Sequence, residues 1–315
     1  MTRATSRPFR FGIQLGLADS GAEWRAAATR AEAAGYDILL IPDHFGQQLS
    51  PFPALAAAAE ATTTIRVGTL VACNDFRHPL MLAKEAATVD LLSGGRFELG
   101  IGAGWAIDDY AETGIPFDGP GVRVARLQES IELVRRAWTG EAFSFDGAHY
   151  IAREYCGGPL PVQRPGPPLL IGSGAPKLLA YAARTADIVQ FAPRPVRDGS
   201  GLIWGNIAAD EVARKVEWVR AAAPERLDSL EISCNVVDVE ITDDAKGGVA
   251  RLAGQLGCEP EALRDSPHVW IGAVDAIVDR LRGWRERLGI SYYAILGDLE
   301  LLEAGAPIVA ALAGT

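Results

Sequence analysis

Apolar and polar positions between residues 65 and 105 follow two different periods. Residues 65–72 read as a strand, and residues 80–92 place apolar side chains about every 3.6 residues, as a helix with one buried face does. Gly94 and Gly95 would end that helix, because glycine accepts the left-handed conformation found at helix ends. Residues 96–102 read as a second strand. Strand, helix and strand in this order predict a βαβ unit, whose two strands are parallel.

The same unit recurs along the chain. Strand-like segments are predicted at residues 9–15, 36–41, 65–72, 96–102, 169–171, 187–191, 231–239 and 291–296. Helix-like segments are predicted at residues 21–34, 53–62, 80–92, 122–138, 176–185, 210–223, 274–288 and 301–312. Strands that alternate with helices in this number predict a (β/α)8 barrel, also called a TIM barrel. The rival is a doubly wound sheet, which usually has a glycine-rich fingerprint after its first strand, and residues 12–16 do not match it.

Two stretches interrupt the alternation. Residues 139–168 contain turn residues, short aromatic runs and a Pro- and Gly-rich end, which predict an inserted hairpin and loop after the fourth strand. Residues 193–209, after the sixth strand, are predicted to contain a loop long enough to act as a lid. Because no shift in composition marks a boundary, we expect one domain over residues 1–315.

Composition narrows the class of protein. A net charge of -10 without clusters of Lys and Arg argues against nucleic-acid or membrane-surface binding and favours a small-molecule partner. No apolar run approaches the roughly twenty residues that span a bilayer, and residues 1–10 read as a ragged terminus without a signal peptide, so a cytoplasmic location is expected. The cysteines lie far apart without CxxC spacing, which predicts neither a metal site nor a disulfide framework: Cys73, Cys156, Cys234 and Cys258.

Candidate chemistry lies where the predicted strands end. The active site of a (β/α)8 barrel is built at the carboxyl ends of its strands, on the loops that lead into the helices. The residues at these ends are Gln14 and Gly16, Asp43 and His44, residues 70–74, residues 102–105, residues 172–175, residues 190–193, Asn235, and Gly297 with Asp298.

His44 is the sharpest single candidate among them. An imidazole can donate or accept a proton near neutral pH, so His44 suits acid or base catalysis. The alternative is a structural histidine in an ordinary loop. Cys73 also stands at a strand end, where it could contact a ligand or pack as a small apolar side chain.

Two glycine-rich turns are further candidates. Residues 100–105 are not a dinucleotide-binding motif, because Trp105 occupies the position that needs a small residue. Glycines there could let a flat ring approach the backbone, or could form a tight turn without a ligand. Residues 172–175 lead into a helix that begins with Pro176, where free N–H groups and the helix dipole attract phosphate. An ordinary turn between strand and helix explains this second stretch equally well.

Several short motifs occur together in a way that resembles one known family. They are residues 33–37 with 43–45, 66–69, 76–79 with 83–84, 91–96, 100–105, 110, 114–117, 123, 126–127, 147–150, 171–174 and 272–277. This set resembles the bacterial luciferase-like monooxygenase superfamily, in particular its actinobacterial branch of deazaflavin-dependent oxidoreductases. The resemblance covers most of the chain and is most specific in its first half.

The resemblance implies a barrel, complete or incomplete, that binds a reduced flavin or the deazaflavin coenzyme F420 at the strand ends. It implies that Asp43 and His44 are catalytic residues beside the ring, with His44 as proton donor or relay. It also implies a cis peptide between Leu70 and Val71 that supports the ring, and Trp105 as a further catalytic residue at the substrate pocket. The remaining cofactor contacts it implies are Cys73, Gly102, Gly104, Asp108, which borders the substrate pocket, and Gly172, Ser173, Gly174 and Ala175, near the phosphate.

The chain also departs from this family's pattern. Related sugar-phosphate dehydrogenases have a glutamate where Trp105 stands and a tryptophan soon after the histidine, where this chain has residues 46–48. These departures argue against the sugar-phosphate reaction, and the aromatic side chains of Trp105, Phe45 and Trp204 indicate an apolar pocket. We therefore expect a homodimeric F420-dependent oxidoreductase that transfers a hydride to or from a small, largely apolar substrate. The alternatives are a monooxygenase that uses O2 and reduced FMN from a separate reductase, and a non-catalytic flavin-binding protein.

Overall fold

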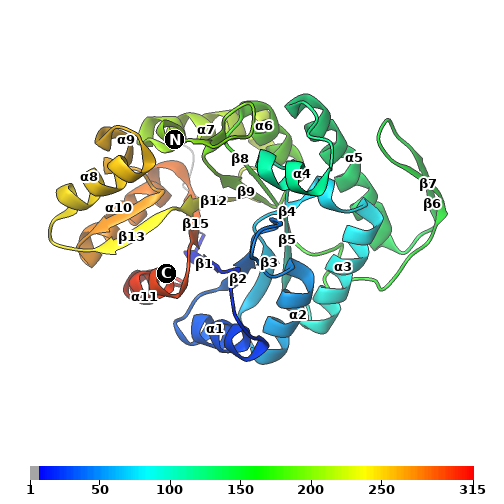
Figure 1. Ribbon diagram of the computed structural model, residues 1–315, viewed down its shortest axis with the longest axis horizontal. Helices are drawn as coiled ribbons and strands as arrows, with labels where there is room; N and C mark the ends of the chain where they lie inside the picture. The colour runs from blue at the N-terminus through cyan, green and yellow to red at the C-terminus, as the bar shows by residue number, and fades with distance from the viewer. Residues whose placement is uncertain (1–6) are drawn as a thin grey trace.

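Parallel strands close into a barrel in the computed structural model, which describes residues 7–315 (Figure 1). Neighbouring strands follow the order β3, β2, β1, β15, β12, β9, β8, β5, and pairing of β3 with β5 closes the ring. The strands are β1 (Arg10–Gln14), β2 (Ile38–Ile41), β3 (Arg66–Thr69), β5 (Phe97–Gly102), β8 (Leu169–Ser173), β9 (Ile188–Phe191), β12 (Glu231–Val236) and β15 (Ile290–Leu296). The prediction of a (β/α)8 barrel is confirmed.

The helices form a ring outside these strands (Figure 1). Four of them, α2, α3, α5 and α6, begin with proline, whose fixed backbone angle suits the first turn and whose missing N–H would be unpaired there. The ring consists of α1 (Gly21–Ala33), α2 (Pro51–Ala61), α3 (Pro79–Leu92), α5 (Pro120–Thr139), α6 (Pro176–Thr185), α7 (Ala209–Ala222), α10 (Val274–Leu288) and α11 (Leu299–Leu312). Each overlaps the helix predicted for it.

Alternate residues of each strand face opposite sides of the sheet. On β2, Ile38 and Leu40 belong to a small apolar cluster with Tyr292 of β15, whereas Leu39 and Ile41 belong to the large core under the helices. Both sides of the sheet are therefore buried, which is why these strands read as almost continuous apolar runs.

Charged side chains fill the amino-terminal end of the barrel. Arg10 donates to Glu98 at 2.6 Å and to Glu231 at 2.5 Å, and Arg66 also donates to Glu98. Arg10 and Glu231 begin β1 and β12, which are not neighbours in the sheet. Because these contacts join strands that are not adjacent, they cross the interior and plug that end of the barrel.

The third predicted strand is wrong as a single element. Residues 65–72 form β3, then a break at Leu70 and Val71, then the short β4 (Ala72–Cys73), which pairs with β5. The peptide bond between Leu70 and Val71 is cis, as the resemblance implied. A 3-10 turn, η1 (Asn74–Phe76), follows and leads into α3.

Three additions extend the barrel. Between α5 and β8 lies a hairpin of β6 (Phe143–Asp146) and β7 (Ile151–Tyr155), which projects from the ring at the right of Figure 1. After β9 comes a second hairpin, β10 (Arg194–Pro195) and β11 (Leu202–Ile203), followed by η2 (Trp204–Ile207). We call residues 193–206 the β10–β11 hairpin.

The third addition was not predicted. The expected strand over residues 231–239 ends at Val236, and the chain continues as β13 (Asp238–Ile241), α8 (Ala245–Leu256), α9 (Pro260–Arg264) and β14 (Val269–Gly272). This unit pairs β13 with β14 and has an apolar core of its own, so it adds a separate small sheet beside the barrel. The short helices α4 (Ile107–Thr113) and η3 (Pro224–Arg226) were also not predicted.

The structure describes residues 7–315, so residues 1–6 of the terminus predicted to be ragged lie outside the described part of the chain. Over residues 7–315, no helix has both the length and the apolar character required to cross a membrane.

Candidate active site at the carboxyl ends of the strands

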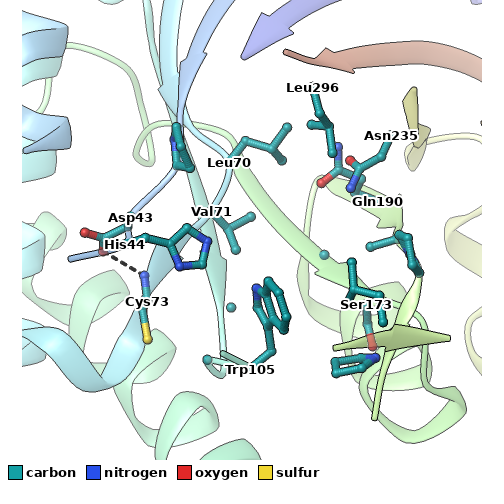
Figure 2. A pocket seen from close by; sticks show the side chains of 18 of the residues that line it. Asp43, His44, Leu70, Val71, Cys73, Trp105, Ser173, Gln190, Asn235 and Leu296 are labelled. Carbon is teal, nitrogen blue, oxygen red and sulfur yellow. Dashed lines mark hydrogen bonds between the residues drawn. The ribbon is translucent and has the colours of Figure 1, made fainter. Parts of the chain in front are cut away.

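A cavity of about 380 Å³ opens at the carboxyl ends of the barrel strands (Figure 2). Most of the predicted site residues line it: Asp43, His44, Leu70, Val71, Cys73, Gly102, Gly104, Trp105, Gly172, Ser173 and Gly174. Asp108 and Ala175 are not among its lining residues within the described chain. The fold therefore brings segments that are far apart in the sequence to one site.

Asp43 anchors the broken third strand. Its carboxylate accepts two hydrogen bonds from the guanidinium of Arg77, at 2.6 and 3.0 Å, and one from the backbone N–H of Cys73 at 2.8 Å (Figure 2). Burial alone would lower the pKa of Arg77, but the bond to Asp43 outweighs burial and raises it. With three donors on one carboxylate, the geometry favours a positioning role for Asp43 over proton transfer.

His44 is oriented by a carboxylate that sequence reasoning missed. Its Nδ1 lies 2.6 Å from Oδ2 of Asp109, and Oδ1 of Asp109 accepts the backbone N–H of Phe45 at 2.9 Å. An ionised carboxylate can only accept, so Nδ1 carries the proton and Nε2 is left as an acceptor. The imidazole lies edge-on to Trp105, with ring centroids 5.9 Å apart. His44 can therefore exchange a proton at Nε2.

The acidic residue predicted for this region was the neighbouring one. Asp108 is exposed on α4, whereas Asp109 is buried and contacts His44. Without a predicted helix, the sequence does not indicate which of the two adjacent aspartates is buried. The helix α4, which decides this, was not predicted. A prediction of that helix would have supplied the missing signal, because its buried face contains Asp109 and Tyr110.

Leu70 and Val71, joined by the cis peptide, form part of the cavity wall. Gln14 of β1 donates from its side-chain amide to the carbonyl of Leu70, and so holds this segment from across the sheet. Gly104 has φ of +76°, and a Cβ there would lie 1.8 Å from the hydroxyl of Tyr110. This glycine is therefore needed for protein packing, in addition to any approach of a ligand to the backbone.

Cys73 is a neutral thiol in this setting. Burial raises its pKa to about 12, and its Sγ lies 3.6 Å from the hydroxyl of Tyr110. A thiol with so high a pKa is a poor nucleophile. Its proximity to the cavity is therefore a matter of packing or ligand contact.

The turn before α6 differs in detail from the predicted phosphate site. Ser173 and Gly174 line the cavity, but the N–H of Ala175 is donated to Oγ of Ser173 at 2.9 Å. Pro176 has no N–H to offer. The groups left for an anion at this helix end are the N–H groups of the following turn, aided by the helix dipole.

Two carboxamides on adjacent strands face the cavity from the other side. Gln190 is 1% exposed and Asn235 is 8% exposed, and Figure 2 shows them close to Leu296. Within the described chain, Nε2 of Gln190 and Oδ1 of Asn235 have no hydrogen-bond partner. Buried polar atoms are rarely left unpaired, so a polar ligand edge that offers both a donor and an acceptor would fit here.

Both acidic side chains of the cavity have partners, but no Lys or Arg of the described chain lines it. Asp43 is bonded to Arg77, and Asp109 is bonded to His44. Burying an unpaired anionic group there would be costly. The interior of the cavity therefore favours uncharged groups, and an anion fits only at the α6 rim.

This fold and this site define a barrel enzyme whose cavity contains a histidine held by a carboxylate. The chain belongs to the luciferase-like monooxygenase family, which it matches over residues 1–232, as the sequence predicted. It is 31% identical to "Uncharacterized protein Rv0953c" of Mycobacterium tuberculosis over 283 residues, which cover 79% of this chain and 99% of that protein.

Two further similar proteins, one by sequence and one by fold, have different cofactors. F420-dependent glucose-6-phosphate dehydrogenase of Amycolatopsis mediterranei is 36% identical over 171 residues, which cover 51% of this chain and 50% of that protein. The oxygenating constituent of 3,6-diketocamphane monooxygenase from Pseudomonas putida, solved in complex with FMN, has the same fold, with a TM-score of 0.72 and 19% identity over 96% of this chain and 98% of that chain. The family therefore supports a deazaflavin or flavin cofactor without deciding between them.

Proposed function

We propose that this enzyme transfers a hydride between coenzyme F420 and a small, uncharged and largely apolar organic substrate. The observation that carries the proposal is the oriented imidazole of His44, whose Nδ1 is held by Asp109 in a cavity that has no cationic lining residue in the described chain. The sequence likeness to an F420-dependent dehydrogenase favours F420.

The residues of the cavity suit a flat heterocycle with one anionic end. The wall at Leu70 and Val71 would support the ring, and the rim at Ser173 and Gly174 would hold the phosphate. The unpaired amides of Gln190 and Asn235 would bond polar edges of the ligands. The bound cofactor would supply the hydride chemistry.

The protein's own task is to move one proton and exclude water. Nε2 of His44 would take a proton from a substrate hydroxyl during oxidation, or its protonated form would give one to the carbonyl oxygen during reduction. Asp109 would keep the imidazole in the tautomer and orientation that this needs. Trp105 and Trp204 line the cavity and would keep solvent from the reacting atoms.

The experiment compares cofactors and a histidine variant. The apoprotein is titrated with F420 and, separately, with FMN, and hydride transfer is followed by the F420 absorbance with a panel of uncharged alcohols and ketones. His44→Ala is expected to retain cofactor binding and lose at least about tenfold in turnover. His149→Ala, in the turn between β6 and β7, is the matched control and should behave as the wild type.

The outcomes separate the candidate functions. Binding of FMN without binding of F420 would contradict the proposal and favour the oxygen-using monooxygenase. That alternative is supported by the FMN-bound monooxygenase structure of the same fold. Binding of F420 without turnover of any compound in the panel would favour the non-catalytic alternative. Unchanged turnover of His44→Ala would remove the role assigned to the imidazole.

A further inference from the structure

Lys215 is a charged side chain buried behind the cavity. It lies on α7 and is 0% exposed. The other buried residues of this helix are apolar: Val212, Val216 and Val219. Its Nζ donates to the backbone carbonyls of Ala192 at 3.0 Å and Asn206 at 2.9 Å. Lysines are rarely buried unless paired with a carboxylate, and no ion pair of Lys215 occurs within residues 7–315.

The two carbonyls lie at the two ends of the β10–β11 hairpin. Ala192 immediately precedes the hairpin and Asn206 is its last residue. Its two strands pair over only two residues each, so pairing alone holds it weakly. The hairpin forms part of the cavity wall, to which it contributes Pro193, Pro195, Leu202 and Trp204.

The tip of the hairpin contacts residues 105–107, which follow β5. The carbonyl of Gly199 accepts the N–H of Ile107 at 3.2 Å. Gly199 has φ of +79°, and a Cβ there would lie 2.5 Å from the carbonyl oxygen of Trp105. The hairpin therefore bridges from β9 to the loop that carries Trp105, and its tip has a close backbone contact there.

We propose that Lys215 is a positioning residue that clamps the two ends of the β10–β11 hairpin and so fixes Trp204 and its neighbours in the cavity wall. One ammonium group bonded to both ends keeps the base of the hairpin closed. With its base held closed, the hairpin can move only at its tip, where Gly199 makes its backbone contact. Releasing the ammonium would free the whole hairpin while the barrel stays folded.

The titratable groups around Lys215 do not form an ion pair with its ammonium within residues 7–315. Burial lowers the pKa of Lys215 to about 8, although Glu211 of α7 opposes that shift. Burial and the charge of Lys215 lower the pKa of His268 to about 3, so its ring is neutral, and burial raises the pKa of the Cys234 thiol, which is neutral as well. The ammonium therefore loses its proton as the pH rises through about 8, and the clamp weakens in that range.

Trypsin reports opening of this hairpin directly in the ligand-free protein. The bond after Arg197 lies in the exposed part of the hairpin, whereas the bond after Arg194 precedes proline and resists trypsin. Lys215→Met keeps an unbranched side chain one atom shorter and removes the N–H donors. We expect cleavage after Arg197 to be at least about tenfold faster in Lys215→Met, with cleavage elsewhere unchanged. Arg214→Met, an exposed neighbour on the same helix, is the matched control and should cleave as the wild type does.

Mass spectrometry of the fragments separates the outcomes. An unchanged rate after Arg197, or an equal rise at every site, would overturn the proposal, because the first shows no clamp and the second shows global destabilisation. If Lys215→Met does not fold, Lys215→Gln takes its place, because glutamine is polar but uncharged and too short to bond both carbonyls. Faster cleavage at Arg197 alone in that variant supports the clamp, and its absence overturns it. No cofactor enters this test, so its result is independent of the proposed function.

Discussion

Replacing Arg77 by methionine would leave the Asp43 carboxylate without its cation. Asp43 is 7% exposed and the side chain of Arg77 is 16% exposed, so both lie largely out of water. Removing one partner of a buried pair costs about 3–5 kcal/mol, because the other charge remains buried and unpaired. The N–H of Cys73 still bonds Asp43, so we expect a loss of about 3 kcal/mol in the free energy of unfolding.

The loss is measured by urea unfolding followed by tryptophan fluorescence, with the free energy taken from linear extrapolation. Arg30→Met is the control on the surface. Arg30 pairs with Glu303, and their side chains are 52% and 55% exposed, so breaking that pair should cost less than about 1 kcal/mol. The contrast between the two variants tests whether burial sets the value of the ion pair.

A loss below about 1 kcal/mol for Arg77→Met would refute this reasoning. The double variant with Asp43→Asn removes the unpaired charge as well and should recover a large part of the loss. If the double variant is as unstable as Arg77→Met, the loss comes from packing, because the guanidinium also lies over the ring of Phe52, 5.1 Å from its centroid.

Two further outcomes are expected. Asp109→Asn should lower turnover at least about tenfold with little change in cofactor affinity, since the amide no longer fixes the tautomer of His44; the exposed Asp108→Asn should leave both unchanged, and equal effects of the two variants would contradict the assigned role. In native protein at about pH 8, dithionitrobenzoate should modify the exposed Cys156 at least a hundredfold faster than Cys73, whose pKa is raised by burial to about 12. Peptide mapping that finds comparable rates would show that Cys73 is accessible and reactive.

The barrel could be predicted because its signals are local and repeated. Strands such as residues 38–41 are buried on both sides, and the helices between them keep a regular apolar face, so their boundaries follow from periodicity. The unit over residues 238–272 could not be predicted in the same way. Its strands are short, and the sheet they form exists only because β13 and β14 meet across a long separation in the chain.

The site was predictable as a set of positions and less so as a set of interactions. The rule that active sites lie at strand ends selects His44, Cys73, Gln190 and Asn235 from the sequence, and all of them line the cavity. The rule cannot say which partner each side chain bonds, because that depends on loops and tertiary packing. Lys215 shows the limit most clearly, since a lysine within a helix reads as a solvated residue until the fold places two carbonyls beside it.

The ion pairs of Arg10, Glu98 and Glu231 make the two ends of the barrel different, because they occupy only one of them. Together with the apolar cluster that contains Ile38, Leu40 and Tyr292, they close the amino-terminal end of the barrel, so a ligand of the cavity would have to enter at the opposite end, past the β10–β11 hairpin. With one shared passage, the molecule that lies deeper has to enter first and leave last. For the proposed function, the closed end of the barrel would therefore impose an order on the binding of cofactor and substrate.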